Sequence, residues 1–241
     1  MVSPPSIATD KIEQFRGRLI VSCQASLGEP LCSPEHICAL SLSAINGGAS
    51  ALRLEGAENV AYVRSRVHLP IVALTKSNDV PESERLRSVY ITPTFEDAAS
   101  LAEAGADIIA LDATQRPRPG GIDLKTLVSR IQNELHKPVW ADVATLAEGL
   151  VAAEAGVNVM STTLSGYTAE TVDRPDEPDF QLLKDLCKQT ALPVVLEGRV
   201  WTPEEVTRAF RSGAYAVVVG SAITRPQLIT RRFVDAIPPL T

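Results

Sequence analysis

The chain carries eight short apolar runs, each rich in valine, isoleucine and leucine and each without regular polar alternation. They lie at residues 18–24, 50–55, 70–75, 107–113, 138–144, 157–163, 193–198 and 214–220. Near-continuous apolar strands are typical of parallel sheets that are covered on both faces. A shorter piece of the same kind occupies residues 89–92. The pattern therefore predicts eight buried parallel strands.

Helical segments follow the apolar runs, and several have clear start and stop signals. One segment begins with Thr202 as N-cap and Pro203 in the first turn, has Glu205 at the capping-box position, and ends at Gly213. Further helices are predicted at 33–48, 58–66, 94–105, 123–135, 145–156, 179–190 and 226–236. Eight strand–helix units predict a single (β/α)8 TIM barrel. An open doubly wound sheet is the alternative, but the chain has no glycine-rich dinucleotide loop.

Composition and charge limit the partners of this fold. We expect one domain over residues 1–241, with a lead and short helix at 1–17 and a tail at 237–241. The net charge of −6 argues against a nucleic-acid or membrane-surface partner. No apolar run is long enough to span a bilayer, and the start of the chain lacks a hydrophobic signal core, so we expect a cytoplasmic protein. The four cysteines form no CxxC pair and are expected to be free thiols, with no metal site.

Polar residues stand at the ends of the predicted strands. In a (β/α)8 barrel the carboxyl ends of the strands carry the chemistry, so these residues are the site candidates. The set contains no histidine, so we expect lysine and carboxylates to carry any proton transfer. Its members are Ser22–Gln24, Arg53, Glu55, Lys76, Asp112, Asp142, Thr162–Thr163, Glu197, Arg199 and Gly220–Ser221.

Lys76 ends the run "PIVALTK", which otherwise has the pattern of a buried strand. A lysine here is either a solvated strand end or a general base or Schiff-base nucleophile. Asp142 and Glu197 are expected at the same mouth of the barrel and favour a chemical role. Burial, or a second cation such as Arg53, would lower the pKa of the amine and let it lose its proton near neutral pH.

The last two strands are followed by glycine-containing segments, "EGRV" and "VGSAITRP". Loops after strands seven and eight form the usual phosphate site of this fold, because their backbone N–H groups face an anion. Arg225 can add a charge-assisted hydrogen bond. The residues thus predict a phosphate-bearing small molecule, handled without a metal or nucleotide cofactor. Proton abstraction beside a carbonyl and imine chemistry both suit such a site.

At these residues the sequence resembles the family of N-acetylmannosamine-6-phosphate 2-epimerases. The matching pieces are "LIVSCQA", "LRLEG", "YITPT", "AGADIIALDAT", "ADVATLAEG", "STTLSGYT", "EGRVWTPEE" and "VVVGSAITRP", in order from about residue 18 to residue 236. The resemblance implies reversible interconversion of N-acetylmannosamine 6-phosphate and N-acetylglucosamine 6-phosphate in amino-sugar and sialic acid breakdown. It also implies that no cofactor is needed and that the protein is a homodimer.

The resemblance also implies roles for individual residues. Lys76 would be the base that removes the C2 proton of the ring-opened sugar, and Glu197 its proton partner. The implied substrate contacts are Gln24, Arg53, Asp142, Thr163 and Tyr167, and the implied phosphate contacts are Gly198, Arg199, Gly220, Ser221 and Arg225.

Two positions depart from the family pattern. The family usually has serine at the position of Ala144, which loses a possible hydrogen bond near Asp142, and glycine at the position of Ser161, which is expected to crowd the sixth strand. Whether one base or two return the proton stays open. A Schiff-base aldolase with Lys76 as nucleophile, another sugar-phosphate isomerase and a silent sugar-phosphate sensor are the alternatives.

Overall fold

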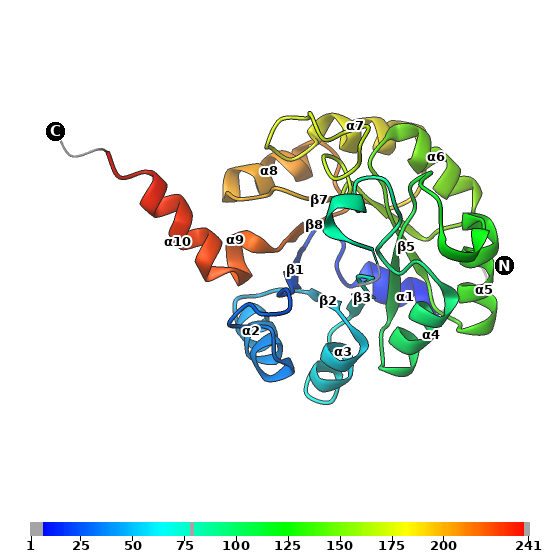
Figure 1. The fold of residues 1–241 in the computed structure, drawn as a ribbon, viewed down its shortest axis with the longest axis horizontal. Helices are drawn as coiled ribbons and strands as arrows, with labels where there is room; N and C mark the ends of the chain where they lie inside the picture. The colour runs from blue at the N-terminus through cyan, green and yellow to red at the C-terminus, as the bar shows by residue number, and fades with distance from the viewer. Residues whose placement is uncertain (1–6, 78–79, 239–241) are drawn as a thin grey trace.

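Eight parallel strands close into a barrel in the computed structural model, which describes residues 7–77 and 80–238. Each strand pairs with the next in sequence, and β8 pairs with β1 (Figure 1). This arrangement confirms the predicted (β/α)8 TIM barrel. The strands are β1 (Leu19–Cys23), β2 (Ala51–Glu55), β3 (Ile71–Leu74), β4 (Ile108–Asp112), β5 (Val139–Asp142), β6 (Val159–Ser161), β7 (Val194–Glu197) and β8 (Ala216–Val219).

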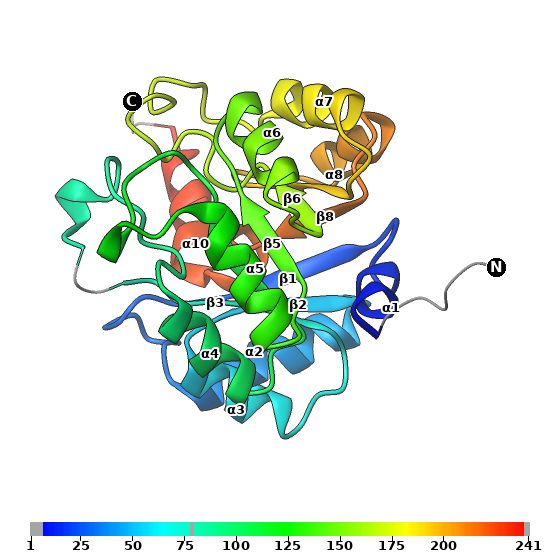
Figure 2. The same cartoon turned by 90° about the vertical axis from the view of Figure 1, so that its right-hand side faces the viewer.

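Helices alternate with the strands and surround the barrel (Figures 1 and 2). The α-helices are α1 (Ile7–Glu13), α2 (Pro34–Asn46), α3 (Ala57–Arg64), α4 (Phe95–Glu103), α5 (Leu124–Glu134), α6 (Leu146–Glu154), α7 (Phe180–Gln189), α8 (Pro203–Arg211), α9 (Ser221–Thr224) and α10 (Pro226–Asp235). Two 3₁₀ turns, η1 (Glu82–Glu84) and η2 (Pro119–Gly121), lie in the loops. None of the helices in the described part of the chain is long and apolar enough to cross a membrane.

Threonine caps fix where three of the helices begin. Thr94, Thr145 and Thr202 each accept a hydrogen bond from a backbone N–H in the first turn, and an acidic side chain three residues later accepts from the cap's own N–H. These reciprocal bonds satisfy N–H groups that would otherwise lack partners at the start of the helix. The chain therefore leaves each strand and enters the next helix at a defined angle.

The strands bury both of their faces, each against a different layer. One cluster of buried side chains lies between the barrel and the helices, and a second fills the barrel interior. Because side chains alternate along a strand, inward positions recur at every second residue. Ala51 and Val195 belong to the interior cluster, and the residues two positions further along are Arg53 and Glu197. The inward face thus changes from apolar to charged toward the carboxyl ends of the strands.

Two features of the structure were not predicted from the sequence. Residues 89–92 do not enter the barrel, because β3 pairs directly with β4; Ile91 instead forms an isolated antiparallel bridge with Lys76. After β8 the chain forms the short helix α9 and then α10, which extends away from the barrel (Figure 1). No residue of α10 is buried.

Candidate active site

A cavity of about 470 Å³ opens at the carboxyl ends of the strands. It brings together most of the residues that the sequence singled out: Gln24, Arg53, Lys76, Thr163, Tyr167, Glu197, Gly198, Arg199, Gly220, Ser221 and Arg225 all line it. Asp142 does not line it, because its side chain is fully buried beneath the cavity. The other strand-end candidates that do not line it are Cys23, Glu55, Asp112 and Thr162. A direct contact of Asp142 with a ligand therefore stays a prediction, while its contacts with other site residues are well defined.

The backbone around Lys76 is held by a short antiparallel pairing beyond the end of β3. Thr92 donates its backbone N–H to the carbonyl of Thr75 at 3.1 Å, and Ser77 donates to the carbonyl of Tyr90 at 2.8 Å. The Thr92 hydroxyl also accepts from the Thr75 N–H at 3.1 Å. These bonds fix the direction in which Lys76 leaves the barrel wall, so its side chain lines the cavity.

The Lys76 amine lies in surroundings that disfavour its charged form. Burial lowers its pKa, the Glu55 carboxylate opposes this effect, and the guanidinium groups of Arg225 and Arg53 reinforce it. A lysine with a lowered pKa has more of its neutral, basic form near neutral pH than a solvated one. The solvated strand-end alternative therefore does not describe this side chain.

Arg53 lies between two carboxylates. Its Nη2 donates to Oδ2 of Asp142 at 2.6 Å, and its Nε is 3.2 Å from Oε1 of Glu197. Burial by itself would lower the pKa of Arg53, but the two carboxylates outweigh it and the pKa is raised. Among the described residues, Nη1 has no hydrogen-bond partner although it is buried. The Arg53 side chain lines the cavity, and its buried Nη1 keeps a hydrogen-bonding capacity that no described protein group uses.

Glu197 is placed to change its protonation state near neutral pH. Burial raises its pKa to about 7, the Arg53 charge opposes the rise, and the Asp142 charge adds to it. The hydroxyl of Thr163 lies 3.0 Å from Oε2 of Glu197 and can donate to it. A carboxyl group with this pKa can take or give a proton under physiological conditions.

A buried hydrogen-bond network surrounds Asp142. Its Oδ1 lies 2.8 Å from the Ser161 hydroxyl, 3.1 Å from Nε1 of Trp140 and 3.0 Å from the Thr163 hydroxyl. Ser161, which was expected to crowd β6, is fully buried. Its hydroxyl bonds to Asp142 and also lies 2.8 Å from Nε1 of Trp140 and 2.6 Å from the Thr163 hydroxyl. Ala144 lies in the interior cluster, where its methyl group can make only apolar contacts.

The loops after β7 and β8 present backbone N–H groups to the cavity. Gly198 and Arg199 both have positive φ, 106° and 56°, which turns the chain sharply at the end of β7. Within residues 7–77 and 80–238, the N–H groups of Gly198, Gly220 and Ser221 donate to no protein acceptor. Arg225 lies beside them, 3.3 Å from Oε1 of Glu29. Free donors and one cation make this end of the cavity suited to an anion.

The loop between β6 and α7 is tied to the loop after β7. Nε of Arg199 donates to the carbonyl of Glu177 at 2.8 Å, and its guanidinium lies 5.8 Å from the ring centroid of Tyr167. Gly166, at φ 85°, leaves room for this arginine, because a Cβ there would collide with it. At the end of β1, Gln24 donates to the Ser22 hydroxyl at 2.8 Å.

Some residues of the site were not singled out from the sequence. Tyr90 and Trp201 line the cavity, and Trp140 contacts Asp142 from below. Trp140 could have been found, because it precedes Asp142 by two residues and so shares its inward face. Tyr90 could not, because its loop returns to Lys76 only through tertiary contacts. Across the described residues, no group of three or more histidine, cysteine or acidic side chains could hold a metal ion.

Comparisons with known proteins agree with this geometry. Residues 37–238 match the family described as "Putative N-acetylmannosamine-6-phosphate epimerase". A relative from Caldanaerobacter subterraneus with the corresponding 2-epimerase name is 44% identical over 229 residues, which is 95% of this chain and 94% of that protein. One from Cutibacterium acnes is 42% identical over 232 residues, covering 95% and 98%.

Solved structures give the same result. The N-acetylmannosamine-6-phosphate 2-epimerase from Clostridium perfringens superposes with a TM-score of 0.89 at 40% identity, over 98% of this chain and 100% of that one. A thiamine phosphate pyrophosphorylase from Pyrococcus furiosus, at 15% identity and a TM-score of 0.59, shares the fold alone. The chain thus belongs to the N-acetylmannosamine-6-phosphate epimerase family.

Proposed function

We propose that this protein interconverts N-acetylmannosamine 6-phosphate and N-acetylglucosamine 6-phosphate by removing and returning the proton at C2, without a cofactor, in amino-sugar and sialic acid breakdown. The observation that carries the proposal is the position of Lys76, an amine with a lowered pKa that lines one cavity together with an unpaired Arg53 donor. Because sugar phosphates are retained inside cells, this substrate implies a cytoplasmic location.

The reaction needs a base and a way to hold negative charge. In the ring-opened sugar the C2 proton is next to the C1 aldehyde, and its removal places negative charge on the aldehyde oxygen. Neutral Lys76 takes the proton and becomes the ammonium, while Nη1 of Arg53 donates to the enolate oxygen. A preformed donor at the atom where charge develops is typically worth about 3–4 kcal/mol of barrier lowering.

Glu197 and Asp142 have separate parts in this proposal. Glu197 has a pKa of about 7, so it can return a proton to C2 or exchange one with Lys76. Asp142, which is fully buried, holds the Arg53 guanidinium in place through its bond to Nη2. Gln24, Thr163 and other cavity-lining residues are left to contact the sugar.

The phosphate is assigned to the end of the cavity after β7 and β8. The unpaired N–H groups of Gly198, Gly220 and Ser221 support this assignment, since a phosphate oxygen can accept from each. Arg225 adds a cation, and Arg199 holds the neighbouring loop. A phosphate fixed here would set how deep the C2 atom lies in the cavity.

Incubation with N-acetylmannosamine 6-phosphate in deuterated water tests the proposal. The product should carry deuterium at C2, and Lys76→Met should lose both turnover and exchange while keeping the wild-type circular dichroism spectrum. Turnover without C2 label would contradict deprotonation there. A lysine with a lowered pKa also suits Schiff-base chemistry. Borohydride reduction during turnover separates the two, because an adduct on Lys76 is expected only for an imine.

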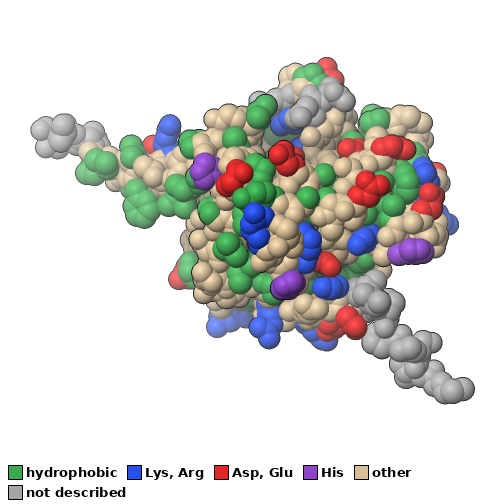
Figure 3. All heavy atoms as spheres, turned by 90° about the horizontal axis from the view of Figure 1, so that it is seen from below, with side chains coloured by type: hydrophobic (Ala, Val, Ile, Leu, Met, Phe, Trp, Pro, Cys, Tyr) green, Lys and Arg blue, Asp and Glu red, His purple; other side chains and the backbone are tan. Residues whose placement is uncertain are grey.

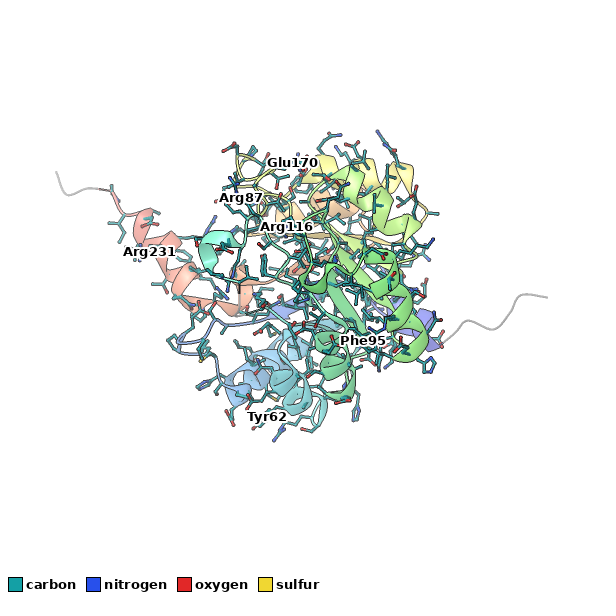
Figure 4. All side chains as sticks on the ribbon, turned by 45° about the vertical axis from the view of Figure 1, so that its right-hand side comes forward. Tyr62, Arg87, Phe95, Arg116, Glu170 and Arg231 are labelled. Atoms are coloured by element: carbon teal, nitrogen blue, oxygen red, sulfur yellow. The ribbon has the colours of Figure 1, made fainter. Side chains whose placement is uncertain are left out.

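We also propose that the protein is a homodimer in which α10 packs against a second copy. The helix has no buried residue, and Phe233, Val234 and Ile237 are 75%, 53% and 68% exposed. Figure 3 shows hydrophobic side chains gathered on this projecting segment, and Figure 4 shows Arg231 on the same helix, away from the barrel. A helix that exposes several large apolar side chains away from its own barrel favours a protein partner over solvent.

Sedimentation analysis of two matched variants tests the dimer. Phe233→Asp places a charge on the exposed apolar side chain of α10 and should shift the protein toward monomer. Leu27→Asp makes the same kind of change on a leucine outside α10 that is even more exposed, at 98%, and should leave the assembly unchanged. A monomeric wild-type protein, or equal effects of both changes, would contradict the role of α10.

A further inference from the structure

Two hydroxyl side chains, Thr163 and Ser161, link the carboxylates of Glu197 and Asp142 in a hydrogen-bond chain beneath the cavity. Oε2 of Glu197 is 3.0 Å from the Thr163 hydroxyl, and that oxygen is 2.6 Å from the Ser161 hydroxyl. The Ser161 oxygen is in turn 2.8 Å from Oδ1 of Asp142. Nε1 of Trp140 lies 2.8 Å from the Ser161 oxygen and 3.1 Å from the same Asp142 oxygen. Both Ser161 and Asp142 are fully buried, so water does not complete these bonds.

Each hydroxyl in this hydrogen-bond chain has one proton, so the direction of the chain is linked to the protonation state of Glu197. Each hydroxyl has one proton to donate, and two hydroxyl oxygens 2.6 Å apart require one of them to donate to the other. When Glu197 is ionised, Thr163 donates to Glu197, Ser161 donates to Thr163, and Asp142 keeps Trp140 and Arg53 as donors. When Glu197 is protonated, it donates to Thr163, Thr163 donates to Ser161, and Ser161 donates to Asp142.

We propose that Ser161 is a positioning residue, whose hydroxyl completes a reversible chain that adds a donor to Asp142 when Glu197 takes up a proton and removes it when Glu197 loses one. Arg53 is held by both carboxylates, at 2.6 Å from Asp142 and 3.2 Å from Glu197. As Glu197 loses its charge, the new Ser161 bond satisfies Asp142, so Arg53 is not drawn fully toward Asp142. The consequence for turnover rests on the proposed function, whereas the existence of the hydrogen-bond chain does not depend on it.

Removing the Ser161 hydroxyl should make it harder for Glu197 to ionise. Without it, Thr163 loses the hydrogen bond that strengthens its own donation to ionised Glu197. When Glu197 is protonated, Thr163 can donate to Asp142 directly at 3.0 Å and so replace the bond that Ser161 made. Both effects disfavour the ionised form of Glu197. The charged groups that face Glu197, namely Arg53, Asp142 and Lys76, are unchanged in this variant.

Trp140 offers a direct readout that needs no substrate. The protein has two tryptophans, so Trp201→Phe leaves Trp140 as the only indole emitter. In this background the emission should titrate with a midpoint near pH 7, because reversal of the chain changes the bonding around Nε1. Adding Glu197→Gln should remove the titration. Adding Ser161→Ala should raise the midpoint by about 0.5 pH units or more, as expected for a lost bond to a charged form.

Two further variants complete the test. Thr163→Val breaks the chain at its other hydroxyl and should raise the midpoint in the same direction, which covers the case of an unstable Ser161→Ala protein. Ser41→Ala removes an equally buried hydroxyl, which donates to the carbonyl of Ile37 and takes no part in this hydrogen-bond chain, and it should leave the midpoint unchanged. An unchanged midpoint in Ser161→Ala, a titration that persists in Glu197→Gln, or no titration at all would each overturn the proposal.

The pH dependence of the activity provides a separate test. In the otherwise wild-type protein, Ser161→Ala should shift the limb of the pH–rate profile that lies near pH 7 upward by the same amount as the emission midpoint. If the wild-type protein does not epimerise amino-sugar phosphates but its emission midpoints move as expected, the proposed function fails and the hydrogen-bond chain stands. If it epimerises them and the emission midpoints do not move, the proposed role of the hydrogen-bond chain is refuted and the proposed function stands.

Discussion

Replacement of Glu197 by glutamine should change how the stability of the protein depends on pH. Burial raises the pKa of Glu197 to about 7 from its ordinary value of 4.5. The folded protein therefore binds this proton more tightly than the unfolded chain does. The contribution of Glu197 to the free energy of unfolding is fully present below about pH 4.5 and is lost as the pH rises through about 7. Glutamine keeps the shape of the protonated group and cannot ionise.

The size of the effect follows from the two pKa values. A difference of about 2.5 pH units corresponds to about 3 kcal/mol over the whole range. At pH 5 the unfolded chain is already mostly ionised at this position, so the part lost between pH 5 and pH 8 is about 2–3 kcal/mol. Relative to the wild-type protein, Glu197→Gln should therefore gain about 2–3 kcal/mol of stability between these two pH values.

Urea unfolding of both proteins at pH 5 and pH 8 measures this difference directly, because ionisations common to both cancel. Glu204→Gln is the matched control: it removes the same charge at an exposed position at the start of α8. Its stability relative to wild type should vary by less than about 1 kcal/mol over the same range, since solvent screens exposed charges. A difference for Glu197→Gln that stays constant with pH, or falls, would refute the reasoning that Glu197 is held protonated by burial.

Three other changes have definite outcomes. Lys76→Arg keeps a cation in the cavity but cannot supply a neutral base, so kcat for C2 deuterium exchange should fall by about 10³-fold or more while the protein stays folded. Arg225→Met removes the cation at the phosphate end of the cavity, so steady-state kinetics should show a KM about 10–100-fold higher with kcat changed far less. Gly149→Ala places a methyl group against the fully buried Leu186 side chain, and thermal unfolding should show a loss of about 1–2 kcal/mol.

The resemblance to a known family and the physical pattern of the sequence reached the same site by different routes. The pattern placed Lys76 and Glu197 at strand ends, and the alternation of side chains along each strand directs both of them inward. Figure 4 shows Arg116 and Arg87 near the same end of the barrel. These arginines lie in long loops, and no periodicity in the sequence relates one loop to the other. The hydrogen bond from Arg116 to the carbonyl of Arg85 is therefore known only from the fold.

The sequence by itself determined the strands, their number and which of their side chains share an inward face. Local information is sufficient for this, because apolar runs, threonine caps and glycine stops act over a few residues. It could not determine which polar groups become partners across the barrel. Arg53 and Asp142 are 89 residues apart and come within 2.6 Å only because the closed barrel sets the stagger of its strands.

The same reason explains why the hydrogen bonds of Ser161 were not predicted. From its own strand, a hydroxyl at this position is only extra volume in a buried place. Its partners are Trp140 and Asp142 on the neighbouring strand β5 and Thr163 two residues ahead, and the strand register brings Asp142 directly opposite it. The protonation states of Lys76 and Glu197 likewise depend on burial and on charges from several strands. Only the tertiary structure fixes those surroundings.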